Sequence, residues 1–171
     1  MFTRLVQTSF GLVMAMGLAV PSMSQDMGVP TGDAILTVSG DIAIKNVDDT
    51  LVLDRDMLTA LPATTFETST IWTDGVHSFI GVSLADLAVE MGVEDGKFLA
   101  TAINDYTVEI PVTDAVEGGP IIAYLMDGQE MSVRDKGPLW VIYPYDSDAD
   151  YRSEVIYSRS IWQLDRLEIV Q

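Results

Sequence analysis

The sequence predicts a single, strand-rich α+β domain over residues 34–171, and three observations favour this fold class. Short apolar runs recur along the whole range with turn residues between them, which is typical of strands. One segment, Ser83 to Met91, instead spaces its apolar residues as one face of a helix does. The chain is also about as long as one ordinary domain, which is enough to bury a hydrophobic core.

The first half of this range is predicted to hold several strands and one short helix. Ile35 to Val38 and Ile42 to Ile44 are candidate strands separated by Ser39-Gly40-Asp41, a turn signal. We expect a helix from Asp54 to Leu61, because the aspartate can cap it and a proline follows at once. Two further strands are expected after it, Thr64 to Trp72 and Val76 to Ile80.

The segment Ser83 to Met91 is the best-defined helix in the sequence. Ser83 can cap its first turn, and Asp86 stands three residues later, in a capping-box arrangement. Gly92 is placed to end the helix. Four residues fall on the predicted buried face: Leu84, Leu87, Ala88 and Met91.

The second half is predicted to consist of strands. The dipeptide Asp127-Gly128 suits a type I′ turn, so a hairpin is expected between Ile121 to Met126 and Gln129 to Val133. The remaining strands expected are Phe98 to Ile103, Tyr106 to Val112, Leu139 to Tyr143, Glu154 to Ser160 and Leu164 to Val170.

The N-terminal residues 1–24 have the pattern of a signal peptide. A short basic start is followed by the apolar run Phe10 to Val20 and by small residues before a cleavage point near Ser24-Gln25. That run is too short for a membrane span, so no membrane insertion is expected after cleavage. Residues 25–33 are expected to form a flexible lead-in, and the mature protein is expected in the periplasm.

The mature chain is strongly acidic and contains no cysteine. Removal of the leader, which holds one base and no acid, takes the formal charge from −17 to −18. A charge of this sign repels phosphate backbones and anionic lipids, so nucleic acids and membrane surfaces are excluded as expected partners. The absence of cysteine excludes disulfides, thiolate metal sites and cysteine nucleophiles.

Basic residues and aromatic rings gather late in the chain. Arg134, Lys136, Arg152 and Arg159 lie in one stretch that also holds a tryptophan and four tyrosines. Guanidinium groups beside rings are typical of a pocket for a flat or anionic small molecule. The alternative is that the bases pair with neighbouring acids while the rings fill the core, and spacing alone favours that alternative.

Five sequence strings, in this order and at this spacing, resemble the oxidoreductase molybdopterin-binding domain, the cofactor-holding domain of sulfite-oxidase-type enzymes. The resemblance covers roughly Ile35 to Val170 and implies a mixed α+β fold with a pterin cleft, whose closing segment maps onto Arg159 and Ile161. The strings are GVHSFIGVSLADL from Gly75, AINDY from Ala102 with EIP from Glu109, MDGQEM from Met126, GPLWVIYP from Gly137 and SRSIWQL from Ser158.

The chain departs from this family at the residue that holds the metal. Enzymes of this type bind molybdenum through a cysteine that precedes the Gly-Val-x-Leu helix, and Thr68 is the nearest counterpart here. A hydroxyl does not ionise as a thiol does, so it is a far poorer ligand. We therefore expect no molybdenum and a binding fold without its catalytic ligand. The alternative is a diverged molybdopterin-dependent oxidoreductase.

Some cysteine-free periplasmic relatives resemble pterin-binding signalling proteins, which act on an inner-membrane cyclic-di-GMP enzyme. This resemblance implies a non-catalytic protein that binds a reduced or molybdopterin-like pterin and relays its occupancy to a membrane sensor. A third reading is a domain that serves only for protein interaction. The candidate ligand contacts are Trp72, Tyr145 and Trp162 for stacking, Asn104 and Asp105 for the ring edge, Arg152 and Arg159 for the oxo group, and His77, Arg134 and Lys136, with His77 also suited to a structural role.

Overall fold

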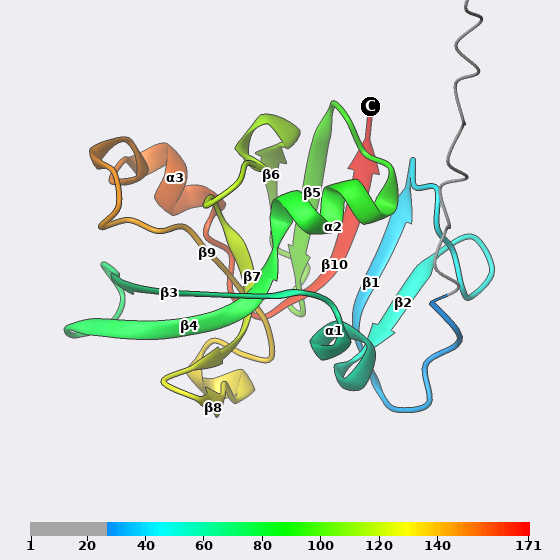
Figure 1. The fold of residues 1–171 in the computed structure, drawn as a ribbon, viewed down its shortest axis with the longest axis horizontal. Helices are drawn as coiled ribbons and strands as arrows, with labels where there is room; N and C mark the ends of the chain where they lie inside the picture. The colour runs from blue at the N-terminus through cyan, green and yellow to red at the C-terminus, as the bar shows by residue number, and fades with distance from the viewer. Residues whose placement is uncertain (1–26) are drawn as a thin grey trace, which may run out of the picture.

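The computed structural model describes residues 27–171, so the predicted signal peptide and its cleavage point lie outside the described residues. The described part is a strand-rich α+β domain with two sheets (Figure 1). Of the predicted lead-in, Thr31 and Gly32 are held in place, because each donates its N–H to Asp54 Oδ2 at 2.8 Å. No helix in residues 27–171 is long and apolar enough to cross a membrane.

The first sheet has the strand order β2-β1-β10-β5-β6. β1 and β10 run parallel, and the other neighbours are antiparallel. This places the last strand of the chain in the middle of the sheet. The strands are β1 (Ala34–Gly40), β2 (Leu51–Asp54), β5 (Lys97–Ala102), β6 (Thr107–Pro111) and β10 (Leu164–Val170).

The second sheet has the order β3-β4-β7-β8, with β9 paired to β7. Its outer pair, β3 and β4, forms a long ribbon that extends away from the first sheet (Figure 1). All neighbouring strands of the second sheet are antiparallel. The strands are β3 (Ala63–Ser69), β4 (Val76–Ser83), β7 (Ile121–Met126), β8 (Gln129–Glu130) and β9 (Trp140–Ile142).

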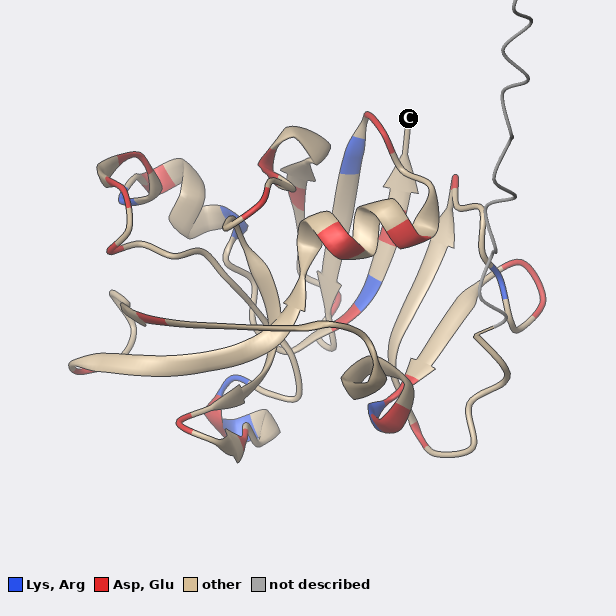
Figure 2. Cartoon of the chain, viewed as in Figure 1, with Lys and Arg blue, Asp and Glu red and all other residues tan. Residues whose placement is uncertain are grey.

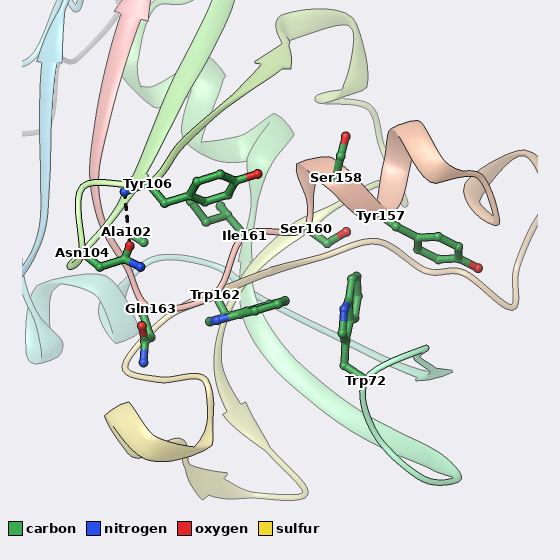
Figure 3. Close-up of a pocket in the computed structure, with 10 residues that line it drawn as sticks. All are labelled: Trp72, Ala102, Asn104, Tyr106, Tyr157, Ser158, Ser160, Ile161, Trp162 and Gln163. Atoms are coloured by element: carbon green, nitrogen blue, oxygen red, sulfur yellow. Dashed lines mark hydrogen bonds between the residues drawn. The ribbon is translucent and has the colours of Figure 1, made fainter.

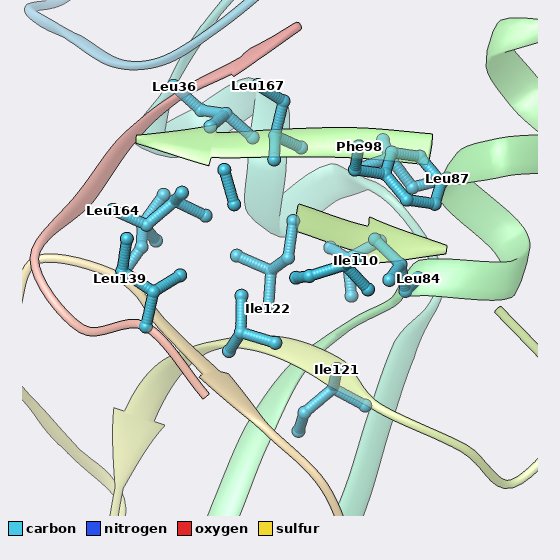
Figure 4. Packing of buried hydrophobic residues seen from close by; sticks show 14 of the residues in the cluster. Leu36, Leu84, Leu87, Phe98, Ile110, Ile121, Ile122, Leu139, Leu164 and Leu167 are labelled. Carbon is cyan, nitrogen blue, oxygen red and sulfur yellow. The ribbon is translucent and has the colours of Figure 1, made fainter. Parts of the chain in front are cut away.

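The hydrophobic core contains side chains of both sheets (Figure 4). Alternate residues of β5 and β6 are buried, as the period of a strand requires, and the segment Ile121–Ala123 of β7 is buried throughout. Each large side chain fully buried in this way stabilises the fold by about 1.5–3 kcal/mol. The side chains drawn include Leu36, Leu84, Leu87, Phe98, Ile110, Ile122, Leu139, Leu164 and Leu167.

Two helices begin and end where the sequence predicts. Asp54 caps α1 (Arg55–Ala60) by accepting from Met57 N at 2.9 Å. Ser83 Oγ caps α2 (Leu84–Met91), and Gly92 ends it with a φ of 70°. The four residues expected on the buried face of α2 are all buried. Both helix predictions are confirmed.

The Asp127-Gly128 turn is also confirmed. Both residues have positive φ, 51° and 74°, as a type I′ turn requires. Leu125 pairs with Glu130 and Met126 with Gln129 across it. The second strand is shorter than predicted, because β8 ends at Glu130 and the chain then forms a 3-10 helix, η2 (Val133–Asp135).

Two strand predictions are wrong. The segment from Glu154 is a helix, α3 (Glu154–Arg159), because Ser153 caps it through Ile156 N. The segment Ile42 to Ile44 is a loop, because its backbone bonds to the end of α2, with Ala43 N donating to Met91 O, and not to a neighbouring strand. The strand missed is β2.

The two sheets are joined by the segment that leads into β10. Val141 N donates to Ile161 O, and Leu164 N donates to Leu139 O, so this segment lies along β9 before it enters the first sheet. Two short 3-10 helices, η1 (Val112–Asp114) and η3 (Ala149–Tyr151), complete the described elements. This connecting segment brings the end of α3 close to the β5–β6 turn.

Candidate ligand-binding pocket

A pocket of about 390 Å³ lies where the segment before β10 connects the two sheets (Figure 3). Its volume is within the size range of small-molecule sites. Its walls come from the turn after β3, the β5–β6 turn, the end of α3 and the segment before β10. The lining residues are Trp72, Ala102, Asn104, Tyr106, Tyr157, Ser158, Ser160, Ile161, Trp162 and Gln163.

Trp72 is the centre of the aromatic wall. Its ring meets four others edge to face, with centroid distances between 5.7 and 6.2 Å, and these rings belong to Trp140, Tyr145, Tyr157 and Trp162. Such edge contacts are favourable for aromatic rings and fix their relative orientation. The three tryptophans of the chain therefore all lie at or directly beside the pocket.

The turn that carries Trp72 is held by a local hydroxyl. Thr70 Oγ1 accepts from the N–H groups of Trp72 and Thr73 at 3.1 and 3.0 Å. A threonine side chain that accepts in this way stabilises a tight turn. β3 ends at Ser69, so Trp72 lies beyond the strand in which the sequence placed it. The turn directs the indole toward Trp162 (Figure 3).

Beneath the wall, a buried hydrogen-bond relay holds the end of α3. Tyr145 Oη donates to Ser160 Oγ at 2.6 Å, and Ser160 Oγ donates to Ile156 O at 2.9 Å. Trp140 Nε1 donates to Ser160 O at 3.2 Å. Burial raises the pKa of Tyr145, so its hydroxyl stays protonated and keeps donating. Tyr145 thus supports the pocket from below and does not line it.

The polar edge of the pocket consists of amides and hydroxyls. Asn104 Oδ1 accepts from Tyr106 N at 3.2 Å, which leaves the Asn104 NH₂ group as a donor on this side (Figure 3). Gln163 lies beside it and donates from Nε2 to Val133 O at 2.6 Å, which leaves its carbonyl oxygen as an acceptor. Ser158 adds a hydroxyl. Together these groups can form hydrogen bonds with both the donors and the acceptors of a ligand.

Arg159, expected as a ligand contact, lies outside this lining. Its Nη1 donates to both carboxylate oxygens of Asp114, at 2.8 and 3.2 Å, and Tyr143 Oη donates to the same carboxylate at 2.7 Å. Burial and this bond to Asp114 raise the pKa of Tyr143. Arg159 borders a separate cavity of about 430 Å³ near Lys97. In the structure, the ion pair of Arg159 with Asp114 links α3 to η1.

Three other candidates lie outside the pocket lining. Asp105 accepts from Arg166 Nη2 at 2.6 Å, away from the pocket lining. His77 lies on β4 with Nδ1 2.7 Å from Asp127 Oδ2 and Nε2 3.0 Å from Asp74 O. The hydrogen bond with His77 is the main reason that the pKa of Asp127 is lowered. Arg152 is exposed and is not in the lining.

Arg134 and Lys136 lie on η2 and directly after it. Arg134 is exposed. Lys136 Nζ lies 5.6 Å from the Trp140 ring centroid and 5.7 Å from the Trp162 centroid, a cation–π geometry. Lys136 therefore contacts the aromatic wall without lining the pocket.

Thr68 is fully buried, and its hydroxyl is engaged in the fold. Its Oγ1 donates to Ser69 O at 3.2 Å and accepts from Asp146 N at 3.1 Å. The N–H of Ser69 binds the Asp146 carboxylate in turn and is the main cause of its lowered pKa. A buried, neutral hydroxyl tied to two backbone groups does not fit the anchoring ligand of a molybdenum centre. Thr68 does not line the pocket either.

Sequence reasoning therefore identified part of the pocket. Of the candidate ligand contacts, Trp72, Asn104 and Trp162 line it. Tyr106 and Gln163, among others, were missed, although both stand inside quoted strings. Tyr106 follows Asp105, which has a φ of 66°, and Gln163 itself has a φ of 53°. The other lining residues that were not singled out as contacts are Ala102, Tyr157, Ser158 and Ser160.

No protein-family model matches this chain, and no curated protein matches it.

Proposed function

We propose that this protein binds a phosphate-free pterin in the pocket at Trp72 and Trp162, without catalysing a reaction. The observation that carries the proposal is an aromatic-walled pocket of about 390 Å³ with amides at one edge. We also propose that the two-sheet domain is of the sulfite-oxidase type. The order of the five sequence strings supports this assignment.

The pocket suits a flat, bicyclic heterocycle. The Trp162 indole lines the pocket, and stacking a heterocyclic base on such a ring contributes about 1–3 kcal/mol. A pterin also has an edge of amino, imino and oxo groups. The amides of Asn104 and Gln163 offer both donors and acceptors to such an edge.

The lining favours a ligand without phosphate. None of the residues that line the pocket is charged, and Arg159 is already bound by Asp114. A phosphate placed within this lining would lose its hydration without contacting a cation there, because Arg134 and Lys136 lie outside the lining, and that loss is costly. The strongly negative chain adds to that cost. Molybdopterin, which carries a phosphate, is therefore the less suitable form.

Non-catalytic binding is favoured over oxidoreductase chemistry by the available donors. The chain has no cysteine, and the Thr68 hydroxyl is buried and engaged. Within residues 27–171 no three His, Asp or Glu side chains gather as a metal site would need. Export to the periplasm and relay to an inner-membrane sensor belong to the same proposal, and they rest on the leader sequence and the resemblance.

The proposal is tested by analysing what the protein carries when it is isolated. The full chain is expressed with its leader in a bacterium that makes tetrahydropterins and is purified from the periplasm. We expect the denatured protein to release close to one equivalent of pterin, detected by fluorescence after oxidation, and only trace molybdenum by mass spectrometry. Stoichiometric molybdenum would support the diverged oxidoreductase instead.

A pair of variants links the bound pterin to the pocket. Trp162→Ala removes the stacking wall, so this variant is expected to be purified with little or no pterin. Val89→Ala is the matched control, because Val89 is 80% exposed on α2 and does not line the pocket. Absence of pterin from the wild type, or equal pterin in both variants, would contradict the proposed function.

A further inference from the structure

The mouth of the pocket is bordered by exposed apolar side chains, which we call the pocket rim. Ile103, Tyr106, Val133 and Trp162 are 44%, 59%, 48% and 38% exposed. Gln163 connects them, because its backbone oxygen accepts from Ile103 N and its side chain donates to Val133 O. The rim residues come from three parts of the chain, and Gln163 links two of these parts directly to the segment of Trp162.

Two basic residues beside the rim have no ion-pair partner within the described residues. Five of the eight basic side chains in residues 27–171 lie within 4 Å of a carboxylate. The other three are Arg152, Arg134 and Lys136, and of these Arg134 lies on η2 and Lys136 directly after it, close to Val133 in the chain. Asp135, which lies between them, has its carboxylate bound by Ser132 Oγ at 2.7 Å.

Unpaired cations are unexpected in a chain with 26 acids and 9 bases. The basic residues near β8 and η2 can be followed in Figure 2, where most of the charged positions along the ribbon are acidic. Exposed apolar patches bordered by charge are typical of protein–protein contacts. Tyr, Trp and Arg are also the residue types that contribute most to the affinity of such contacts.

We propose that the pocket rim, with Arg134 and Lys136, docks a protein partner whose contact segment places an acidic side chain beside an aliphatic or aromatic one. Charge complementarity selects this occupant, because two of the three basic side chains without an ion pair in residues 27–171, Arg134 and Lys136, lie beside the rim. Nucleic acids and anionic lipids are disfavoured by the charge of the whole chain.

This inference deepens the proposed function and depends on it in one respect. Tyr106 and Trp162 belong to both the rim and the pocket lining, so a partner on the rim covers the mouth of the pocket. Binding of the ligand and of the partner are then linked, and each must change the affinity for the other by the same factor. The affinity for the partner would in this way depend on whether the pocket holds its ligand.

The surface is tested by photocrosslinking from the rim in living cells. A photoreactive amino acid is placed at Val133, which is exposed and does not line the pocket, and at Val89 as a control on a different face. We expect one discrete adduct from Val133 and none from Val89. We also expect the crosslinked partner peptide, identified by mass spectrometry, to contain Asp or Glu beside an apolar residue.

Charge reversal then tests the chosen occupant. Arg134→Glu is expected to lower the adduct yield about tenfold or more, because like charges would face each other, whereas Arg134→Lys keeps the charge and the adduct. An adduct unaffected by Arg134→Glu, an adduct with a second copy of this chain, or no adduct at all would overturn the docking surface.

The pterin content of the same preparations separates the two proposals. Bound pterin without a Val133 adduct would overturn the docking surface and leave the proposed function intact. An adduct that depends on Arg134, in a protein that holds no pterin, would overturn the proposed function and leave the docking surface intact.

Discussion

Replacing Trp72 with alanine removes the ring on which the aromatic wall depends. Four aromatic contacts are lost together, with Trp140, Tyr145, Tyr157 and Trp162. Each such pair contributes about 0.5–1.5 kcal/mol beyond its buried area. A fully buried Trp→Ala change costs about 3–5 kcal/mol, and because Trp72 is only partly buried we expect the lower end, about 3 kcal/mol.

The loss is measured by thermal and urea unfolding followed by circular dichroism. A destabilisation of about 3 kcal/mol lowers the Tm of a domain of this size by roughly 6–12 °C. With a urea m-value of about 2 kcal/mol/M, the midpoint falls by about 1.5 M. Pterin binding should be lost as well, because Trp162 loses the ring against which it is oriented.

Ile71→Ala is the matched control for this experiment. Ile71 is the neighbouring residue in the same turn, and it is 60% exposed, so its loss should change stability by about 0.5 kcal/mol or less. Our reasoning about the aromatic wall fails if Trp72→Ala costs less than about 1 kcal/mol, or if the two variants are equally destabilised.

Three further predictions concern the framework around the pocket. Asp54→Asn should lower stability at pH 7, because hydrogen bonds from Met57, Gly32 and Thr31 hold the pKa of this carboxylate below its ordinary value of 3.8. The stabilisation is present above that value and is lost as the pH falls through the lowered pKa, so melts at pH 7 and pH 3 should show the wild-type advantage shrinking. Gly81→Ala should destabilise by about 3 kcal/mol or more, because a Cβ would lie 2.2 Å from Ile122 O in the β4–β7 pairing, whereas the exposed Thr65→Ala should not. Asp114→Ala should cost about 2–4 kcal/mol and speed hydrogen exchange in α3, because Arg159 and Tyr143 lose their acceptor; unchanged exchange would contradict the role given to this contact.

The elements that the sequence predicted well have local causes. α2 is defined by Ser83, Gly92 and a regular apolar face, and the β7–β8 turn by two residues that tolerate positive φ. α3 was missed because a run of Val, Ile and Tyr is common in strands, although Ser153 before Glu154 is a helix-capping signal. In such a short helix the cap and the tertiary contacts outweigh the strand preference of the side chains.

The pocket was harder to predict because its residues act through distant partners. Arg159 looked free for a ligand, but its acceptor, Asp114, is 45 residues earlier and nothing in the sequence pairs them. Tyr145 looked like a stacking ring, but it is buried under Trp72. Most lining residues stand in two of the strings quoted for the resemblance, whereas the direction of a side chain such as Trp72 depends on its local turn, here the one held by Thr70.

The most direct measurement is calorimetric titration of the ligand-free protein with tetrahydrobiopterin under anaerobic conditions. We expect one site in the wild type and an affinity about 5- to 150-fold weaker in Trp162→Ala, which corresponds to the loss of about 1–3 kcal/mol of stacking. Dihydroneopterin triphosphate should bind less tightly, since no basic residue lines the pocket. No binding to the wild type, or equal affinity in the variant, would show that the aromatic pocket does not hold a pterin ring.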